Sequence, residues 1–288
     1  FIPSLLRYPK IGLWDKLNIA RVMLIAKFTD TSDANIGNIS FYDWLKRYHQ
    51  SERAIKCFWE LLIKPVVNDN LVNVNASVGL MFVNVGLLGS KDSAKIACSK
   101  KGLTESIGKP STDYLNRLGC RMHFGSYVKR LEMVDGRISG VYLNSGKFLK
   151  SSLIVSALPF DSLVKILNLS NIPWHNISHS IQELTWSPIV NVYVWYDRPV
   201  MHEEFCMVLD SPLEWVFNRT AILDTNTDDA SHDCATDRGY CICISVSAAR
   251  EYINWTKEDI IRFFCDEMES VFIGANEAKI LDAVVVKQ

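Results

Sequence analysis

The hydrophobic period of this chain changes near residue 100, and that change limits the folds that the chain can adopt. Before residue 100, apolar residues recur at the spacing of amphipathic helices. One such stripe consists of Leu13, Leu17, Ala20, Leu24 and Phe28. A second stripe consists of Ile55, Phe58, Trp59 and Leu62. We expect the helix that carries the second stripe to stop at Pro65, because proline disrupts a helix interior.

Residues able to cap a helix precede several of the predicted helices. Ser40 is followed three residues later by Asp43, and Ser51 stands just before the second apolar stripe. Near the end of the chain, Thr256 and Asp259 repeat the first pattern. The helix predicted after them carries four apolar residues, Ile260, Phe263, Phe264 and Met268.

Beyond residue 100 the sequence favours short strands joined by turns. A short helix over 111–118 comes first and should end at Gly119. Strands are predicted over 121–124, 127–133, 137–143, 189–196, 214–217 and 240–246. Asp135-Gly136 and Asn144-Ser145-Gly146 are typical of hairpin turns. A buried strand over 153–155 should lead into a loop and a helix begun by Pro159, and a further helix should run through Ile177, Ile181 and Leu184. The predicted fold class is therefore α/β, with α and β elements mixed.

Composition excludes several classes of protein. Thirty-one lysines and arginines nearly balance 32 acidic residues, so the net charge of −1 gives no reason to expect nucleic acid. The longest apolar run, 78–88, is shorter than the roughly 18 residues that a membrane span needs. None of the eight cysteines forms a C-x-x-C pair, which indicates free thiols in a reducing compartment. Cys241 and Cys243 would share a strand face, but two ligands do not make a metal site, and we expect no metal.

The chain contains no complete catalytic motif. There is no G-x-G-x-x-G, phosphate-binding loop, G-x-S-x-G or H-E-x-x-H sequence. His175 and His179 could share a helical face, but a solvated pair is the simpler interpretation. The aspartates within 220–239 lack the spacing of a calcium loop and indicate a solvated loop. The catalytic residues stay unknown at this stage.

Aromatic residues gather in otherwise apolar segments. They are Phe58, Trp59, Trp186, Tyr193, Trp195, Trp215 and Phe217. Any one of them is more often a core residue than part of a ligand cavity. As a set, they suit a pocket for an apolar, polyunsaturated substrate.

Six strings, read together, carry a family resemblance. They are Ser40 to Leu45, Phe58 to Leu62, Gly86 to Ser90, Ser187 to Val192, Trp195 to Met201, and Trp215 to Arg219. Their order and spacing resemble hydroxysqualene dehydroxylases, also called squalene-associated FAD-dependent desaturases, of the flavin amine oxidase and phytoene desaturase superfamily. The stretch from Ser187 to Met201 is the most specific part, whereas the other strings would fit many flavin oxidoreductases.

The resemblance implies a divided architecture. A Rossmann-type FAD-binding domain is built from separated segments, and a substrate domain is inserted between them. Residues 1–100 would be substrate-domain helices, 101–169 a segment of the FAD domain, and 170–288 the substrate-domain sheet with its helices. The family's glycine-rich loop and its C-terminal Gly-Asp segment are absent. Since the chain begins at Phe1 and ends on a strand-like run, we expect it to be an internal fragment without these FAD-binding segments.

The resemblance also implies site residues. FAD would meet the main chain at Val128 and the loop formed by Ala157, Leu158 and Pro159. The substrate-lining candidates are Phe58, Trp59, Asn68, Trp195, Trp215 and Phe217. Relatives usually have a proline-containing loop at the position of residues 97–102, and the sequence of these residues fits that loop poorly.

The implied reaction is reductive dehydroxylation of hydroxysqualene to squalene, a step of squalene and hopanoid biosynthesis. Such an enzyme would be cytoplasmic and could touch the membrane surface from which its isoprenoid substrate comes. No motif names the acid that would protonate the leaving hydroxyl, and Glu60 is no more than a guess. A carotenoid-type desaturase or amine oxidase is the first alternative, and a non-catalytic lipid-binding remnant is the second. Oligomeric state is not indicated.

Overall fold

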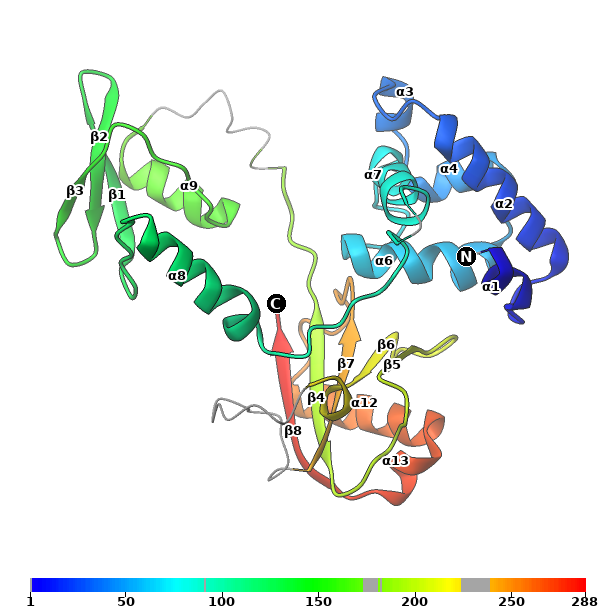
Figure 1. Ribbon diagram of the computed structural model, residues 1–288. Coiled ribbons are helices and arrows are strands. Elements are labelled where there is room, and N and C mark those ends of the chain that lie inside the picture. Colours follow the sequence, from blue (N-terminus) through cyan, green and yellow to red (C-terminus); the bar gives the residue numbers. More distant parts are fainter. Residues whose placement is uncertain (1, 91, 173–180, 182, 224–238) are drawn as a thin grey trace. The chain divides into compact units, whose positions relative to one another are not determined.

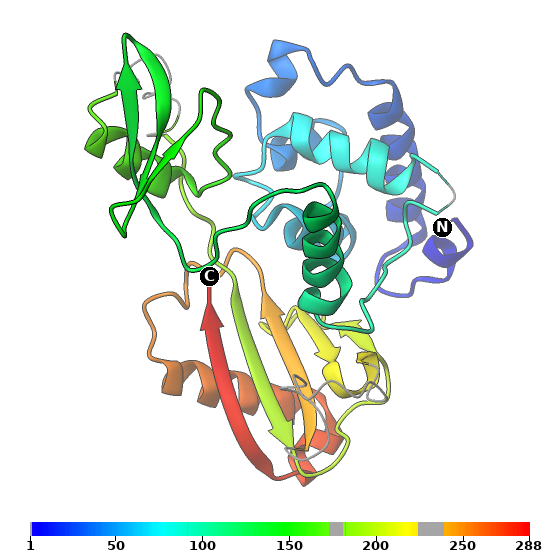
Figure 2. The same ribbon diagram turned by 60° about the vertical axis from the view of Figure 1, so that its left-hand side comes forward.

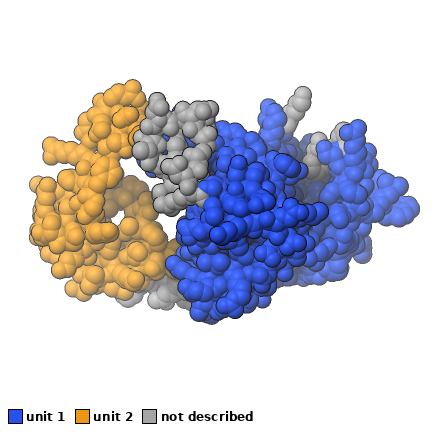
Figure 3. Space-filling model, turned by 90° about the horizontal axis from the view of Figure 1, so that it is seen from below, with its two compact units in different colours: residues 1–106, 187–288 blue, residues 107–186 orange. Residues whose placement is uncertain are grey.

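The computed structural model describes residues 2–90, 92–172, 181, 183–223 and 239–288. The chain forms two compact units, coloured separately in Figure 3. Unit 1 comprises Phe1–Ser106 and Ser187–Gln288, and unit 2 comprises Ile107–Trp186. The sequence placed boundaries after residues 100 and 169. Which segment binds FAD and which binds substrate stays a prediction.

The first part of unit 1 is a layer of helices (Figure 1). Its α-helices are α1 (Ile2–Arg7), α2 (Leu13–Phe28), α3 (Ala34–Gly37), α4 (Phe41–Arg47), α5 (Glu52–Ala54), α6 (Leu61–Val67) and α7 (Ala76–Phe82). Two π-helical turns, η1 (Ile55–Glu60) and η2 (Val83–Leu87), are inserted before α6 and after α7. The predicted caps are confirmed, because Ser40 Oγ accepts from Asp43 N at 3.0 Å and Ser51 Oγ from Ala54 N at 3.0 Å. Phe41, Trp44 and Trp59 pack together in the core of this layer.

Helix α2 carries the predicted stripe of Leu13, Leu17, Ala20, Leu24 and Phe28, and all five of these residues are exposed. The buried residues of α2 are Ile19, Val22, Met23 and Ala26. The helix therefore has apolar residues on two opposite sides. Periodicity identifies both stripes but cannot tell which of them meets the rest of the protein.

The prediction that the helix stops at Pro65 is wrong, since Pro65 lies inside α6. Proline fixes φ near the helical value and removes one hydrogen bond, so a helix held by its packing can continue through it. The helix ends three residues later at Asn68, whose φ of 54° is left-handed. Asparagine adopts this conformation more readily than most residues.

The second part of unit 1 is a five-stranded antiparallel sheet in the order β5-β6-β7-β4-β8. The strands are β4 (Val190–Tyr196), β5 (Phe205–Met207), β6 (Trp215–Asn218), β7 (Tyr240–Val246) and β8 (Ile280–Lys287). Helices α11 (Arg219–Ile222), α12 (Lys257–Val271) and α13 (Ile273–Glu277) accompany it. The predicted cap of α12 is confirmed, with Asp259 N donating to Thr256 Oγ1 at 3.1 Å.

The two faces of this sheet differ because successive strand residues point to opposite sides. One face carries aliphatic residues that pack with α12 in a buried core, as Figure 2 shows for the helix. That core includes Val192, Val194, Ile242, Ile244, Ile260 and Phe264. The residues between them on the strands, including Tyr193, Trp195, Trp215 and Phe217, belong to the opposite face, which we call the aromatic face.

Unit 2 contains the turn η3 (Thr104–Gly108, which begins in unit 1), α8 (Lys109–Arg117), α9 (Phe160–Leu169) and a three-stranded sheet. The strands are β1 (Val128–Val134), β2 (Arg137–Leu143) and β3 (Phe148–Lys150), in that order and antiparallel. Asp135 and Gly136 both have positive φ, 49° and 74°, as the predicted hairpin turn requires. The mixed α and β fold class is thus confirmed.

Two strand predictions in unit 2 are wrong. Residues 121–124 and 153–155 form no strand, and Leu153 and Val155 are exposed. Within the described part of the chain, no strand pairs with either segment. A short apolar run has the composition of a buried strand, but it becomes one only beside a partner strand.

Some predictions fall outside the described residues. They concern Ile177 of the helix expected around 177–184, the His175 and His179 pair, and residues 224–238 of the acidic loop. None of the helices within the described ranges combines the length and the apolar composition needed to cross a bilayer.

Candidate functional site

An apolar cavity of about 430 Å³ lies in unit 1 between the helical layer and the aromatic face of the sheet. The helical layer contributes Leu62, Pro65, Phe82 and Leu87. The sheet contributes Trp215 and Phe217 from β6 and Ser245 from β7. Volumes of this order are typical of small-molecule sites, which are mainly apolar with a few polar groups.

Strand geometry places the aromatic wall of this cavity. Trp215 and Phe217 are two residues apart on β6, so both side chains point to the same side. Their rings stack with centroids 5.8 Å apart. Phe205 of β5, paired with Phe217, lies within 6.1 Å of both rings. Trp215 and Phe217 therefore form an aromatic wall against which a flat, apolar chain can lie, and Phe205 supports this wall without lining the cavity.

A second cavity, of about 350 Å³, shares Pro65 and Trp215 with the first. Its lining includes charged groups, namely carboxylates from Glu60, Asp210 and Glu214 and ammonium groups from Lys56 and Lys64. We call it the acidic pocket. The shared residues make the two cavities neighbours, so one substrate could reach both an apolar and an ionisable surface.

Glu60 ends the π-helical turn η1 and is a half-buried carboxylate of the acidic pocket. Burial raises the pKa of Glu60 above its usual value; Lys64 opposes this effect and the Glu214 carboxylate adds to it. Lys64 itself forms an ion pair with Glu214. A carboxyl group with a raised pKa in a cavity is suited to hold and release a proton.

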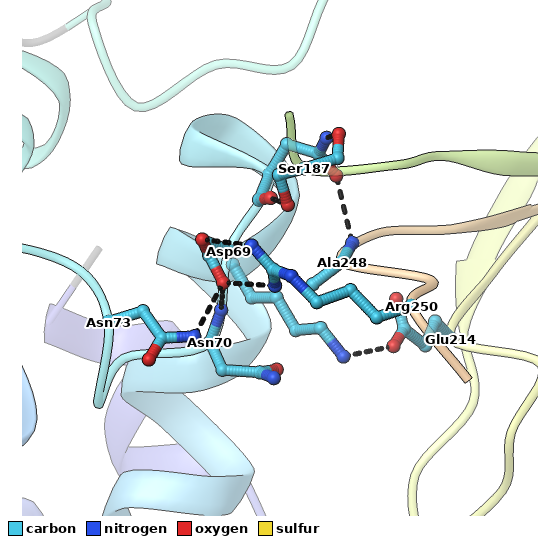
Figure 4. Close-up of polar contacts among 9 residues, drawn as sticks. Asp69, Asn70, Asn73, Ser187, Glu214, Ala248 and Arg250 are labelled. Carbon is cyan, nitrogen blue, oxygen red and sulfur yellow. Dashed lines mark hydrogen bonds and ion pairs between the residues drawn. The ribbon is translucent and has the colours of Figure 1, made fainter. Parts of the chain in front are cut away.

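A set of polar contacts joins the end of α6 to the sheet beside the apolar cavity (Figure 4). We call it the Asn68 clamp. Asn68 donates from Nδ2 to the Ser187 carbonyl at 2.5 Å and accepts at Oδ1 from Ala248 N at 2.9 Å. The Ser187 hydroxyl donates back to the Asn68 carbonyl. The left-handed conformation of Asn68 is what turns its side chain and carbonyl toward these partners.

Asp69 extends the clamp by one residue. Arg250 donates to its two carboxylate oxygens at 2.7 and 2.8 Å, a bidentate pair. Hydrogen bonding from Arg250, supported by Asn73 and Asn70, lowers the pKa of Asp69 to about 2. Together with the Lys64–Glu214 pair, these contacts hold the helical layer over the aromatic face, and so maintain the cavity between them.

The predicted substrate-lining residues fall into three groups. Trp215 and Phe217 line the apolar cavity, and Asn68 lies beside it in the clamp. Trp195 is buried on the aromatic face and lines neither cavity described above. Phe58 and Trp59 instead face the core of the helical layer, where their rings meet at 5.0 Å. Trp59 in turn packs against Phe41 of α4, with ring centroids 6.0 Å apart. Contact of either Phe58 or Trp59 with substrate stays a prediction.

Sequence reasoning did not identify several residues of the site. Leu87 belongs to a quoted string, Gly86 to Ser90, but was not proposed as a lining residue. Ser245 could have been found from the alternation of β7 once its buried side was known. Asp69 and Arg250 carry no local signal, since their partnership joins positions 181 residues apart.

The predicted FAD contacts all lie in unit 2. Val128 begins β1, which is an edge strand of its sheet within the described ranges, and Val128 itself is half-buried. Ala157, Leu158 and Pro159 are exposed and lead directly into α9. An edge strand at Val128 and an exposed loop at Ala157 to Pro159 fit a cofactor held through main-chain contacts. Asp161 in the first turn of α9 disfavours a phosphate there and favours an uncharged part of the cofactor. That these residues touch FAD stays a prediction.

Comparison with known proteins decides the family. Residues 36–287 match the family described as flavin containing amine oxidoreductase. The chain belongs to this family. This family consists of flavin-containing oxidoreductases, and the cofactor is FAD.

Among curated relatives are 15-cis-phytoene desaturases. The Glycine max protein is 26% identical over 260 residues, which covers 86% of this chain and 43% of that protein. The Synechococcus elongatus protein is 22% identical over 264 residues, covering 86% of this chain and 52% of that protein. The chain thus spans about half the length of these relatives.

Solved structures share the fold at low identity. An oxidoreductase from Methanosarcina mazei superposes with a TM-score of 0.70 at 14% identity, covering all of this chain and 63% of that one. A putrescine oxidase variant superposes with a TM-score of 0.67 at 13% identity, covering 96% and 62%. Cyclohexylamine oxidase from Brevibacterium oxydans gives 0.66 at 13% identity, covering 98% and 62%.

Proposed function

We propose that the protein is an FAD-dependent oxidoreductase acting on a long, linear isoprenoid, and that the reaction is desaturation of a carotenoid precursor. The observation that carries this proposal is the apolar cavity walled by the stacked rings of Trp215 and Phe217. The phytoene desaturases among the curated relatives support the same class of substrate. A purely hydrocarbon ligand would be bound mainly by burial of apolar surface.

The residues of this chain would position the substrate and keep water away. Desaturation removes a hydride and a proton from neighbouring carbon atoms. FAD, when bound, supplies the hydride-accepting chemistry. Trp215 and Phe217 would hold the isoprenoid extended along the sheet, and their faces would stabilise positive charge at an allylic carbon. The Asn68 clamp would keep the cavity closed around the chain, excluding water from the reactive carbon.

The acidic pocket favours a second candidate, the reductive dehydroxylation of hydroxysqualene. In that reaction the hydroxyl takes up a proton and leaves as water, and reduced FAD, when bound, would supply the hydride that the resulting allylic cation takes up. Glu60 has the raised pKa expected of the proton donor, and it lies next to the apolar cavity. The Ser187 to Met201 string supports this candidate as well.

One set of assays separates the candidates. Full-length protein loaded with FAD is given phytoene with a quinone acceptor, or hydroxysqualene with a reductant, and products are followed by chromatography. We expect a new conjugated double bond in the phytoene product. Squalene formed only from hydroxysqualene would replace the first candidate with the second. Turnover of an amine, with neither isoprenoid consumed, would overturn both.

A non-catalytic lipid binder is the remaining alternative. Such a protein would bind isoprenoids but would retain no stoichiometric flavin. The visible spectrum of the purified full-length protein distinguishes the two, because a flavin band that survives desalting supports an enzyme.

A further inference from the structure

The outward side of α2 is an apolar surface that nothing in the described part of the chain covers. It consists of Leu13, Trp14, Leu17, Leu24 and Phe28, which are between 51% and 84% exposed. We call these five residues the α2 stripe. Figures 1 and 2 both show α2 at the outer edge of the helical layer. Leu6 of the neighbouring α1 is also exposed and adds to the apolar surface.

The α2 stripe is not needed to hold α2 in place. The opposite side of the helix packs into the core through Ile19, Val22, Met23 and Ala26. Apolar residues on a solvent-facing helix surface disfavour solubility. A cluster of this size therefore marks an interaction surface. Trp14 is the most exposed member at 84%. Tryptophan is enriched where a protein meets the boundary between lipid headgroups and acyl chains.

Positive charge predominates on the segment that carries the α2 stripe, although two exposed aspartates, Asp30 and Asp33, follow the helix directly. The segment from Ile2 to Phe28 holds five cationic residues, Arg7, Lys10, Lys16, Arg21 and Lys27. Its single acidic residue, Asp15, is turned toward the protein and accepts from Ser51 Oγ at 2.7 Å. The charged residues exposed on α2 are Arg21 and Lys27. This local excess of positive charge stands in a chain whose net charge is −1.

We propose that the α2 stripe docks the protein onto an anionic lipid bilayer. Leucine, phenylalanine and tryptophan side chains would enter the interface, with α2 lying in the membrane plane. Arginine and lysine would keep their apolar stems along the lipid and their charged ends at the headgroups. A second copy of the chain fits less well, because it would bring two equally cationic surfaces together. Docking is independent of which isoprenoid the enzyme takes.

Vesicle sedimentation of the full-length protein tests the proposal. Vesicles are made of phosphatidylcholine alone or of equal parts phosphatidylcholine and phosphatidylglycerol. We expect binding to the phosphatidylglycerol vesicles, with weaker binding at high salt. The double substitution Leu17→Asp and Leu24→Asp should weaken binding at least about tenfold, since two apolar side chains no longer enter the lipid. Ile273→Asp is the matched control, at an apolar α13 residue that is 82% exposed.

Two further measurements make the outcome decisive. Circular dichroism and retained flavin show whether the double variant is folded. Independently of that variant, brominated lipid should quench the fluorescence of the natural protein more than that of Trp14→Phe. Equal quenching of the two proteins would overturn the proposal. So would vesicle binding by the folded double variant at the natural strength, or a homodimer that only this double substitution dissociates.

Discussion

The two faces of the five-stranded sheet are made by the same strands, yet they serve different purposes. On the packed face, Val192, Ile242 and Ile244 are almost completely buried beneath α12. On the aromatic face, Trp215 and Phe217 are only half-buried and border a cavity. Because neighbouring residues of a strand alternate between these faces, stability and binding can be changed separately, one position apart.

The packed face should dominate stability. Ile244→Ala removes a fully buried side chain and should lower the free energy of unfolding by about 2–5 kcal/mol. Urea unfolding followed by circular dichroism measures the loss. Val284→Ala, on the other side of the sheet and 43% exposed, is the matched control and should have a much smaller effect. Equal losses would remove the distinction between the faces.

The aromatic face should dominate activity. Trp215→Ala enlarges the apolar cavity and should lower kcat/KM for the isoprenoid about ten- to a hundredfold, through lost apolar contact. Phe205→Ala is the control, because Phe205 packs on Trp215 without lining the cavity. Steady-state kinetics of the full-length enzyme decides the outcome. An equal loss for both variants would place the site elsewhere.

The Asn68 clamp is where helical layer and sheet meet. Arg250→Ala should destabilise the protein by about 1–2 kcal/mol at neutral pH, because Asp69 loses its bidentate partner. The pKa of Asp69 is lowered to about 2, so its stabilisation is present above the ordinary aspartate pKa near 3.8 and is lost as pH falls through about 2. The free energies of unfolding of the natural protein and of Arg250→Ala should therefore approach each other as the pH falls. Urea unfolding at several acidic pH values measures both. Arg262→Ala, at an exposed arginine with a 3.8 Å contact to Asp259, should have little effect.

Glu60 should have the smallest effect on stability. Its pKa is raised, so the natural protein loses stability as pH rises through the folded-state pKa. Glu60→Gln cannot ionise and should be more stable at neutral pH by less than about 1 kcal/mol, with no difference below the pKa of an unfolded glutamate. Thermal unfolding at several pH values is the measurement. A Gln variant that is less stable at neutral pH would show that the charged carboxylate is favoured in place.

Activity gives Glu60 a second test that bears on the reaction. Glu60→Gln should abolish dehydroxylation if the carboxyl group protonates a leaving hydroxyl, but it should leave desaturation largely intact. Glu203→Gln, at an exposed glutamate outside both cavities, is the control.

Local sequence determined much of the secondary structure. Residues 137–143 and 240–246 were predicted as strands and form β2 and β7 at those bounds. The caps at Ser40, Ser51 and Thr256 also formed as predicted. In each case the cause lies within a few residues: alternating apolar residues in a strand, or a hydroxyl group next to a free backbone N–H. The mixed fold class follows from the same local patterns, whereas the flavoenzyme superfamily was reached through the resemblance of six strings to a known family.

Tertiary structure decided which surfaces meet. The stripe of Leu13, Leu17, Leu24 and Phe28 had the correct helical period, but the opposite side of α2 faces the core. Residues 153–155 had strand composition without a partner strand. The Asp69–Arg250 pair and the neighbouring cavities join segments more than a hundred residues apart. A helix or turn is stabilised by nearby atoms, whereas a cavity or a buried face depends on which distant surface comes to cover it.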